Sequence, residues 1–254
     1  MEKLFPILEF DPSPTAIIEP NLAPLAEPCP EKAVLCFFQE VIQELANSGQ
    51  IRQIGSLGSE IGANPLYELA WEGQRLLLFH PGVGAPLAAG FLEESIGLGA
   101  RKFIACGGCG VLDQGIAAGH PVILTSAVRD EGTSYHYLPP AREVAASPKA
   151  VQVLETALQR HTIEYRLGKS WTTDGLYRET IQRRAMRIAE GCEVVEMEAS
   201  AFFAVAQFRG VEFGQVVYGG DLVHPEGWDF RGWHKRQDDR HLIFWLAVEA
   251  CSLL

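Results

Sequence analysis

The chain has 254 residues, of which 47% are hydrophobic and 21% charged, a balance typical of a globular protein and not of a disordered one. Its 32 acidic and 21 basic residues give a net charge of -11, which argues against nucleic-acid binding because most of the surface repels a polyanion. No secretory signal, membrane span or disulfide framework is indicated, so we expect a soluble cytoplasmic protein with one domain over residues 1–254 and with free thiols.

Apolar runs alternate with helical patterns along the chain. Strands are predicted at residues 15–18, 75–80, 102–106, 121–125, 162–167, 193–197 and 214–218. Helices are predicted at residues 86–98, 148–160, 179–189, 199–209 and from about 240 onward. This alternation predicts an α/β fold with a mostly parallel sheet that helices cover on both faces.

Two glycine-containing turns follow predicted strands. Gly82-Val-Gly84 precedes a helix and is either a tight turn or a ligand loop whose backbone N–H groups can bind an anion, which makes Gly84 a candidate substrate-binding residue. In Cys106-Gly-Gly-Cys109 the thiols match neither zinc spacing nor a redox motif, and no metal site is expected. Gly107 and Gly108 instead let the backbone approach a ligand at the carboxyl end of a strand, where open α/β sheets bind ligands.

The segment 192–210 places two carboxylates in an otherwise apolar run. Burying an unpaired carboxylate costs several kcal/mol, so Glu196 and Glu198 indicate either a helix edge with one wet face or a binding site. Glu198 follows a predicted strand and can accept two hydroxyl protons from a vicinal diol, while Met197 offers an apolar face to a sugar ring. Asp221 ends the next strand, as a second acid of the site or as a helix N-cap.

Two loops combine aromatic and polar groups. Residues 171–178 bring Tyr177 and Arg178 after a strand, in a binding loop or an ordinary connection. Residues 227–233 hold two tryptophans close to glycines and form a lid, an interface loop or a packed surface loop.

The segments 82–86, 103–110, 195–199 and 219–221 resemble, in order and spacing, the nucleoside phosphorylase/nucleosidase family. This family includes purine nucleoside and uridine phosphorylases and methylthioadenosine nucleosidases. The resemblance implies a three-layer α/β/α sandwich with a mostly parallel mixed central sheet, assembled as a homo-oligomer, a dimer or a trimer of dimers. It also implies cleavage of the N-glycosidic bond of a small-molecule nucleoside, with no metal or organic cofactor and no nucleic-acid or membrane partner.

The resemblance also implies roles for single residues. Glu198 is similar to the ribose-binding glutamate of the family, Met197 to the residue under the sugar, and the neighbouring Glu196 belongs to the same substrate-binding segment. Asp221 is similar to the acid that protonates a purine leaving group at N7. Tyr177 lies where relatives place aromatic contacts to the base.

The residues that bind phosphate in the phosphorylases are missing. A glycine and an arginine follow the first strand in the family, and with the first strand predicted at 15–18 this position falls in residues 18–24, which contain neither. A further arginine and a serine are replaced by Ala105 and Gly108. A phosphate dianion beside Glu198 and Asp221 without a cationic partner is costly.

Three hypotheses follow from this departure. The enzyme is a phosphorylase, a pentosyltransferase with inorganic phosphate as presumed co-substrate, that recruits Arg178, Arg183 or His80. Alternatively it is a hydrolytic nucleosidase in which Glu19, at the end of the first predicted strand, activates water as general base. The third hypothesis is a non-catalytic relative that binds or stores nucleosides.

Overall fold

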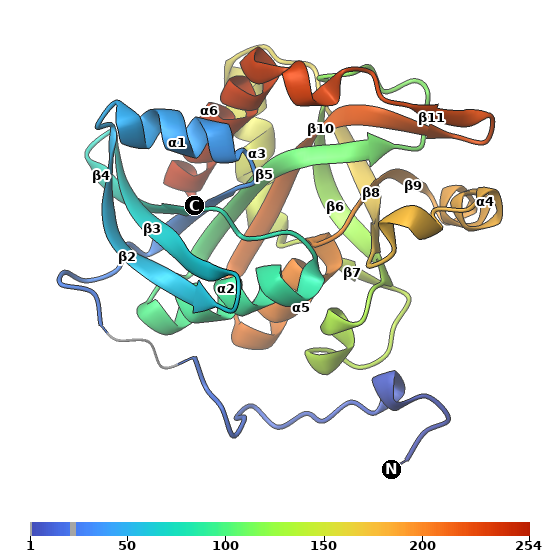
Figure 1. Ribbon diagram of the computed structural model, residues 1–254, viewed down its shortest axis with the longest axis horizontal. Coiled ribbons are helices and arrows are strands. Elements are labelled where there is room, and N and C mark those ends of the chain that lie inside the picture. The colour runs from blue at the N-terminus through green and yellow to red at the C-terminus, as the bar shows by residue number, and fades with distance from the viewer. Residues whose placement is uncertain (1, 21–23) are drawn as a thin grey trace.

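An 11-stranded sheet runs through the protein, with helices on both of its faces (Figure 1). The computed structural model describes residues 2–20 and 24–254. The strands are β1 (Lys32–Cys36), β2 (Ile51–Ser59), β3 (Gly62–Trp71), β4 (Gln74–Phe79), β5 (Lys102–Val111), β6 (Pro121–Asp130), β7 (Glu143–Ala145), β8 (Arg166–Thr173), β9 (Cys192–Glu196), β10 (Glu212–His224) and β11 (Gly227–Asp229). The α-helices are α1 (Gln39–Asn47), α2 (Ala85–Leu98), α3 (Pro148–Arg160), α4 (Ile181–Ala189), α5 (Ala199–Arg209) and α6 (Gln237–Leu253). Four short 3-10 helices are η1 (Pro6–Leu8), η2 (Thr133–His136), η3 (Leu176–Arg178) and η4 (Trp233–Lys235).

The strand order is β11-β10-β6-β8-β9-β5-β1-β4-β3-β2, and β7 pairs with β6. Because β10 also pairs with β5, the strands β10, β6, β8, β9 and β5 close into a ring, and β1, β4, β3 and β2 extend from it as an open wing. Strand β1 is parallel to β4 and β5, β5 is parallel to β10, and β8 is parallel to β6 and β9. The hairpins β2–β3, β3–β4 and β10–β11 are antiparallel, which makes the sheet mixed.

Helices α2 and α5 cover one face of the sheet, and α1, α3 and α6 cover the other, so the predicted three-layer α/β/α class is confirmed (Figure 1). On the first face Phe213 of β10 stacks on Phe202 of α5, with ring centroids 4.7 Å apart. On the second face Leu154 of α3 and Phe244 of α6 are fully buried. Burial of such side chains stabilises the fold by roughly 2 to 3 kcal/mol each.

Two helices have the bounds that their end signals predict. Helix α3 begins with Pro148 in its first turn, where the missing N–H has no intrahelical partner to lose. Helix α5 ends at Gly210, whose φ of 66° is left-handed and favours glycine. Helix α5 is buried almost throughout, so the sheet and α2 fix its position and with it the residues at its amino terminus.

The predicted strand at 15–18 is wrong. These residues belong to no helix or strand, and Ile17 and Ile18 are exposed, because no neighbouring strand pairs with them. The first strand of the sheet is β1, whose short apolar run the sequence pattern did not distinguish from other buried segments. The strand predicted at 162–167 begins only at Arg166, since Thr162 has a φ of 55° in the turn after α3. Helix α1 and strands β2, β3, β7 and β11 were not predicted.

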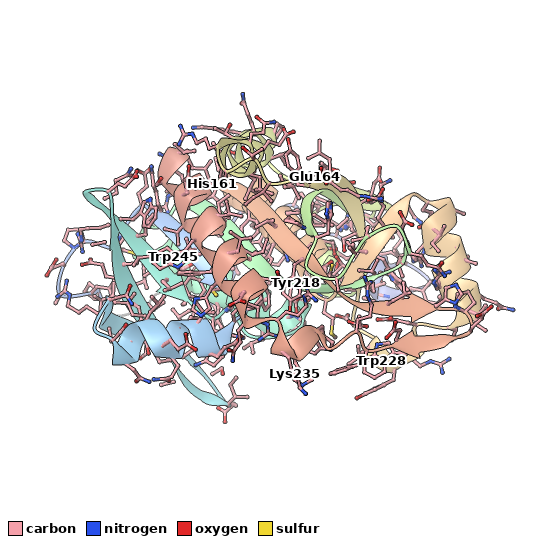
Figure 2. All side chains as sticks on the ribbon, turned by 90° about the horizontal axis from the view of Figure 1, so that it is seen from above. His161, Glu164, Tyr218, Trp228, Lys235 and Trp245 are labelled. Atoms are coloured by element: carbon pink, nitrogen blue, oxygen red, sulfur yellow. The ribbon has the colours of Figure 1, made fainter. Side chains whose placement is uncertain are left out.

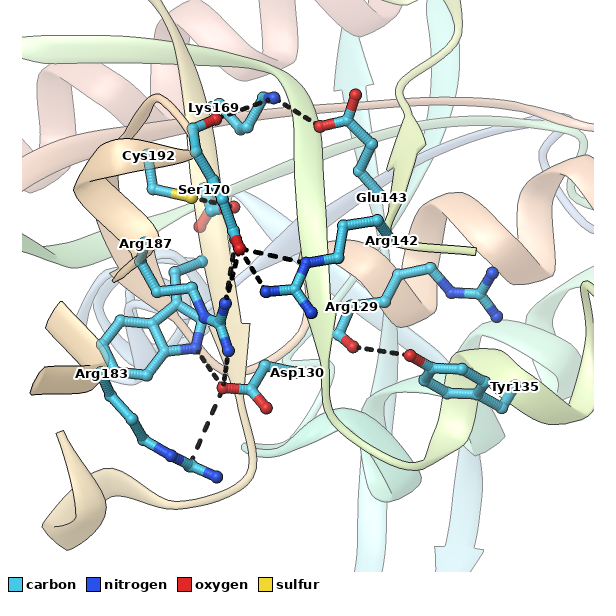
Figure 3. A network of polar contacts seen from close by, with 12 residues as sticks. Arg129, Asp130, Tyr135, Arg142, Glu143, Lys169, Ser170, Arg183, Arg187 and Cys192 are labelled. Atoms are coloured by element: carbon cyan, nitrogen blue, oxygen red, sulfur yellow. Dashed lines mark hydrogen bonds and ion pairs between the residues drawn. The ribbon is translucent and has the colours of Figure 1, made fainter. Parts of the chain in front are cut away.

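A network of charged residues fastens α4 to the ring (Figure 3). The carboxylate of Asp130, at the end of β6, accepts hydrogen bonds from Trp171 Nε1 at 2.9 Å and from Arg187 Nη2 at 3.1 Å. Arg187 also donates to Glu190 Oε2 at 2.9 Å, and its guanidinium is almost fully buried. Since η3 directly precedes α4, this network also fixes the position of residues 176–180.

We expect Arg187→Met to lower the free energy of unfolding by about 3 kcal/mol, because it leaves Asp130 partly buried without its main cation. Urea unfolding of the variant and of wild type measures the difference. Arg183→Met is the matched control, since the Arg183 guanidinium lies 3.8 Å from the same carboxylate but is 45% exposed. The control is expected to cost about 1 kcal/mol or less, and equal losses in the two variants contradict the argument.

Candidate functional site

A cavity of about 750 Å³ lies at the carboxyl ends of β1, β5, β9 and β10. Its wall includes the residues just after β1, the turn between β9 and α5, part of η3, and aromatic side chains of the β10–β11 hairpin and η4. Glu198 and Asp221 both line it, as does Met197. The acids that the sequence pattern placed at one sheet edge therefore share one cavity.

Glu196 holds the turn between β9 and α5. Its Oε1 accepts hydrogen bonds from the hydroxyls of Ser170 at 2.8 Å and Thr172 at 2.6 Å. Its Oε2 accepts from the backbone N–H groups of Glu198 at 2.7 Å and Ala199 at 2.6 Å. Although burial raises its pKa, these four donors stabilise the carboxylate. Glu196 lines the cavity, but its hydrogen bonds go to the chain itself, which makes it a positioning residue.

Glu198 is the N-cap residue of α5, and its side chain is directed back across the turn. Its Oε1 accepts a hydrogen bond from Gly84 N at 2.6 Å, and its Oε2 accepts one from Met197 N at 3.2 Å. Gly84 has a φ of 88°, a left-handed value that favours glycine and lets its N–H face the carboxylate. Burial and the nearby charge of Glu196 raise the pKa of Glu198 to about 8.

The raised pKa of Glu198 predicts a loss of stability with rising pH. The folded protein keeps this proton up to about pH 8, whereas the unfolded chain loses it near its ordinary pKa of 4.5. Between these values the folded state binds more protons, so the free energy of unfolding falls as pH rises, by up to about 1.4 kcal/mol per pH unit for one proton. Urea unfolding across this window is expected to show a smaller slope for Glu198→Gln than for wild type. Equal slopes contradict the assignment.

Asp221 lies near the end of β10 and accepts a hydrogen bond from Trp228 Nε1 at 2.6 Å. Trp228 belongs to β11, and Figure 2 shows it at the outer end of the β10–β11 hairpin. Burial raises the pKa of Asp221, while the Trp228 donor and the charge of Arg231 oppose this shift. The loop at 227–233 thus contacts the second acid of the cavity through Trp228.

Glu179 is a third acid at this end of the cavity, and no sequence pattern singled it out. It lies between η3 and α4 and lines the cavity together with Leu176 and Tyr177. Burial, followed by the charge of Asp221, raises the pKa of Glu179 to about 7. A single acid shortly before a helix gives no pattern by which the sequence distinguishes it from an ordinary first-turn acid.

Aromatic residues and one arginine form the corner beside Gly108. Phe37 and Phe38, directly after β1, line the cavity, and Arg240 of α6 lies over the ring of Phe38 with its guanidinium carbon 5.4 Å from the centroid. Arg240 donates to the hydroxyl of Tyr218 at 3.1 Å and forms an ion pair with Glu40. Figure 2 labels Tyr218 beside the first turns of α6. Among the described residues, Arg240 is the one lysine or arginine that lines the cavity.

The predicted glycine contacts divide into two groups. Gly108 lines the cavity, and a Cβ there would lie 3.3 Å from the ring of Tyr218. Gly107 does not line the cavity. It faces Phe37 instead, and a Cβ at this position would lie 3.0 Å from the ring of Phe37. Gly107 therefore makes room for Phe37, and Gly84 serves the site through its N–H to Glu198.

The basic residues expected to take up phosphate do not line the cavity. Arg178 is exposed, and Arg183 faces Asp130. His80 is half-buried and its Nδ1 accepts from Gly82 N at 3.0 Å. Burial lowers the pKa of His80, so it carries no charge at neutral pH. Tyr177, by contrast, lines the cavity as predicted for a base neighbour, with 93% of its surface exposed.

The expected placement of Glu19 is wrong. Its carboxylate accepts from Ala16 N at 2.7 Å and lies 3.6 Å from Arg209, at the carboxyl end of α5. Glu198 is at the opposite end of this helix, which has 11 residues and is therefore about 16 Å long. The expectation depended on a first strand at 15–18, which does not form.

The same correction applies to the phosphate segment. The true first strand is β1, and the residues after it are Phe37, Phe38, Gln39 and Glu40. None of these four residues is a glycine or an arginine. The residues that the resemblance assigns to phosphate binding after the first strand are therefore also absent at the corrected position. Of the segment 18–24, residues 21–23 lie outside the described part of the chain.

Two further observations concern the described residues, 2–20 and 24–254. No helix among them is both long and apolar enough to cross a membrane. Within the same ranges no cluster of three or more His, Cys, Asp or Glu side chains has the arrangement of a metal site.

Comparison with known sequences gives a consistent result. The model of the phosphorylase superfamily matches residues 31–239. The chain is 28% identical to guanosine phosphorylase of Halorubrum lacusprofundi, over 69% of this chain and 76% of that protein. It is 31% identical to uridine phosphorylase of Treponema pallidum, over 68% of this chain and 70% of that protein.

Solved structures share the fold. Purine nucleoside phosphorylase of Toxoplasma gondii, in complex with immucillin-H, aligns with a TM-score of 0.78 and 22% identity, covering 89% of this chain and 92% of that one. AMP nucleosidase of Bacteroides thetaiotaomicron aligns with a TM-score of 0.71 and 20% identity, covering 89% and 88%. At these identities the structural likeness establishes the fold alone.

Proposed function

Because this chain belongs to the phosphorylase superfamily, the family of nucleoside phosphorylases and nucleosidases, we propose that it cleaves the N-glycosidic bond of a nucleoside. The observation that carries the proposal is that Glu198 with Met197 and Asp221 with Tyr177 line the same cavity. The first pair suits a pentose and the second a base. The cavity, at about 750 Å³, is large enough for a drug-sized ligand.

Each end of the cavity has a task in this reaction. The carboxylate of Glu198, held by the N–H groups of Gly84 and Met197, accepts hydrogen bonds from the sugar hydroxyls. The bond between the anomeric carbon and the base breaks, both electrons go to the base nitrogen, and the pentose becomes oxocarbenium-like. A proton from the acidic end around Asp221 neutralises the departing base.

Water is the acceptor that the charges of the cavity support best. Four carboxyl groups line the cavity. Among the described residues, Arg240 is the one basic side chain that lines it, and Arg240 is already paired with Glu40. Even with Glu198 and Glu179 protonated, a phosphate dianion would meet acidic groups and no free cation. A water molecule carries no charge, adds to the electrophilic carbon and then releases its proton to solvent.

Phosphate is the second candidate acceptor, and two observations favour it. The relatives with the names quoted above are phosphorylases. Arg240 lies beside Tyr218 and Gly108, and Gly108 replaces a serine that the resemblance assigns to phosphate binding. If Glu40 turns away from Arg240, that guanidinium becomes available to a phosphate oxygen.

The acceptor is tested by incubating the protein with guanosine, inosine, adenosine and uridine, with and without inorganic phosphate. Free pentose at equal rates in both buffers supports hydrolysis, which is the expected result. Pentose 1-phosphate formed only with phosphate supports phosphorolysis and overturns the choice of water. Binding of these nucleosides without release of base indicates a binding protein and overturns the proposed cleavage.

A further inference from the structure

The carboxyl groups of the cavity differ in the partners that the chain gives them. Glu196 accepts four hydrogen bonds, Glu198 two from backbone N–H groups, and Asp221 one from Trp228 Nε1. Glu179 has no hydrogen-bond or ion-pair partner within residues 2–20 and 24–254, and only its burial and the charge of Asp221 affect its titration. Glu179 is thus the acid of this cavity whose oxygens are free for a ligand.

Burial raises the pKa of Asp221, but two contacts oppose this shift and favour its ionised form. Trp228 Nε1 donates to its Oδ2 at 2.6 Å, and a donor on a carboxylate oxygen stabilises the anion. Arg231 acts in the same direction through its charge. The Oδ2 that faces Trp228 already has a donor and is poorly placed to carry a proton.

Glu179 is arranged to keep its proton. It is half-buried and near Asp221, and two like charges at one site disfavour the second ionisation. Its pKa of about 7 matches a group that gives up a proton near neutral pH. The pKa values of both acids are raised by burial, but only Asp221 has a hydrogen-bond donor that favours its anion, so Glu179 is the better placed of the two to carry the proton.

The position of Glu179 matches the base and not the sugar. It follows η3, whose Leu176 and Tyr177 line the cavity. The charge of Asp221 acts on Glu179, so these two acids lie near each other, beside the residues of η3 that line the cavity.

We propose that Glu179 is the general acid that protonates the leaving base, with Asp221 as the anion that holds the proton on Glu179. The proposal rests on the proposed nucleoside cleavage and changes the role of Asp221 that the family resemblance implies. As the glycosidic bond breaks, its electron pair goes to the base and the Glu179 proton transfers to it. Water bonds to the anomeric carbon and releases one proton, and Glu179 takes a proton back from solvent.

The test separates proton donation to the base from every other role. Wild type, Glu179→Gln and Asp221→Asn are assayed on guanosine, inosine, adenosine and uridine and on para-nitrophenyl β-D-ribofuranoside, whose nitrophenolate leaves without being protonated. We expect Glu179→Gln to lower kcat on the nucleosides by about 100-fold or more, but to change the rate on the nitrophenyl riboside by less than about threefold. Asp221→Asn is expected to show a smaller nucleoside-selective loss, of about tenfold, because Glu179 then loses its proton more readily.

Two results overturn the proposal. One is an equal loss on both kinds of substrate in Glu179→Gln, which indicates a structural or binding role. The other is a larger nucleoside-selective loss in Asp221→Asn than in Glu179→Gln, which returns the proton to Asp221. A wild-type protein that cleaves none of the four nucleosides instead contradicts the proposed function itself, and the inference fails with it.

Two further variants guard against loss of folding. Glu226→Gln is the matched control, because Glu226 is an exposed acid of the β10–β11 hairpin that does not line the cavity, and both rates are expected to be unchanged. Glu179→Asp keeps a carboxyl group but withdraws it by one methylene. Its kcat on the nucleosides is expected to fall about tenfold, and its rate on the nitrophenyl riboside is expected to stay unchanged. If Glu179→Gln does not fold, Glu179→Asp replaces it in the test, and an equal loss on both kinds of substrate again overturns the proposal.

Discussion

Glu198→Ala is expected to lower kcat/KM for nucleoside cleavage by at least about 1,000-fold while the protein remains folded. The substitution removes the carboxylate that Gly84 and Met197 orient toward the sugar, and no other described acid at that end is free. Because the side chain lines a cavity and its burial disfavours ionisation, its loss does not require the fold to change. Steady-state rates and far-UV circular dichroism measure the two parts of the expectation.

Glu94→Gln is the matched control for this prediction. Glu94 lies on α2, is partly buried, and also has a pKa raised by burial, but it does not line the cavity. Its variant is expected to keep the wild-type rate. Wild-type-like turnover in Glu198→Ala contradicts the sugar-binding role, and a loss of turnover in both variants points to a general effect on the fold.

Glu196→Gln is expected to lower the free energy of unfolding by about 4 kcal/mol, because the amide nitrogen of glutamine must face two of the four donors around Glu196. Each hydrogen bond to a charged group contributes about 1.5 to 3 kcal/mol. Because these bonds fix the backbone of Glu198, we also expect kcat to fall by about 100-fold. Urea unfolding and steady-state kinetics on the same preparation measure both effects.

The control for Glu196→Gln is a second acid on the same strand. Glu193 of β9 has a carboxylate oxygen that is buried without a hydrogen-bond partner, so glutamine there removes a charge without breaking a bond. Glu193→Gln is expected to leave stability and kcat nearly unchanged. A stable and fully active Glu196→Gln protein shows that the turn does not depend on the four donors.

The two acids of the 195–199 segment show what the sequence leaves open. The sequence predicts that both Glu196 and Glu198 belong to the substrate-binding segment, with Glu198 as the residue that binds the sugar. In the structure β9 ends at Glu196, and Glu198 is already the N-cap of α5. The carboxylate of Glu196 therefore accepts hydrogen bonds within the turn, whereas that of Glu198 lies at the cavity. This difference depends on the positions of Ser170 and Thr172 on β8, which donate to Glu196.

Local signals were sufficient where neighbouring residues decide the structure. The first-turn proline of α3 and the terminal glycine of α5 set helix bounds through backbone geometry, and the apolar runs of β4, β5 and β10 indicated a covered sheet. The motif order from residue 82 to 221 was likewise enough to indicate the family, which the phosphorylase superfamily match confirms. These features are carried by short segments of chain.

Pairings between distant segments were decided only by the tertiary structure. Strand β1 is recognisable only between β4 and β5, and its true position put Phe37 and Phe38 at the cavity and Glu19 at the far end of α5. Burial, and after it the charge of Asp221, raises the pKa of Glu179, and Asp221 lies more than 40 residues away along the chain. Burial and charge act through space, so the sequence indicated Glu198 and Asp221 but neither Glu179 nor the pKa of each acid.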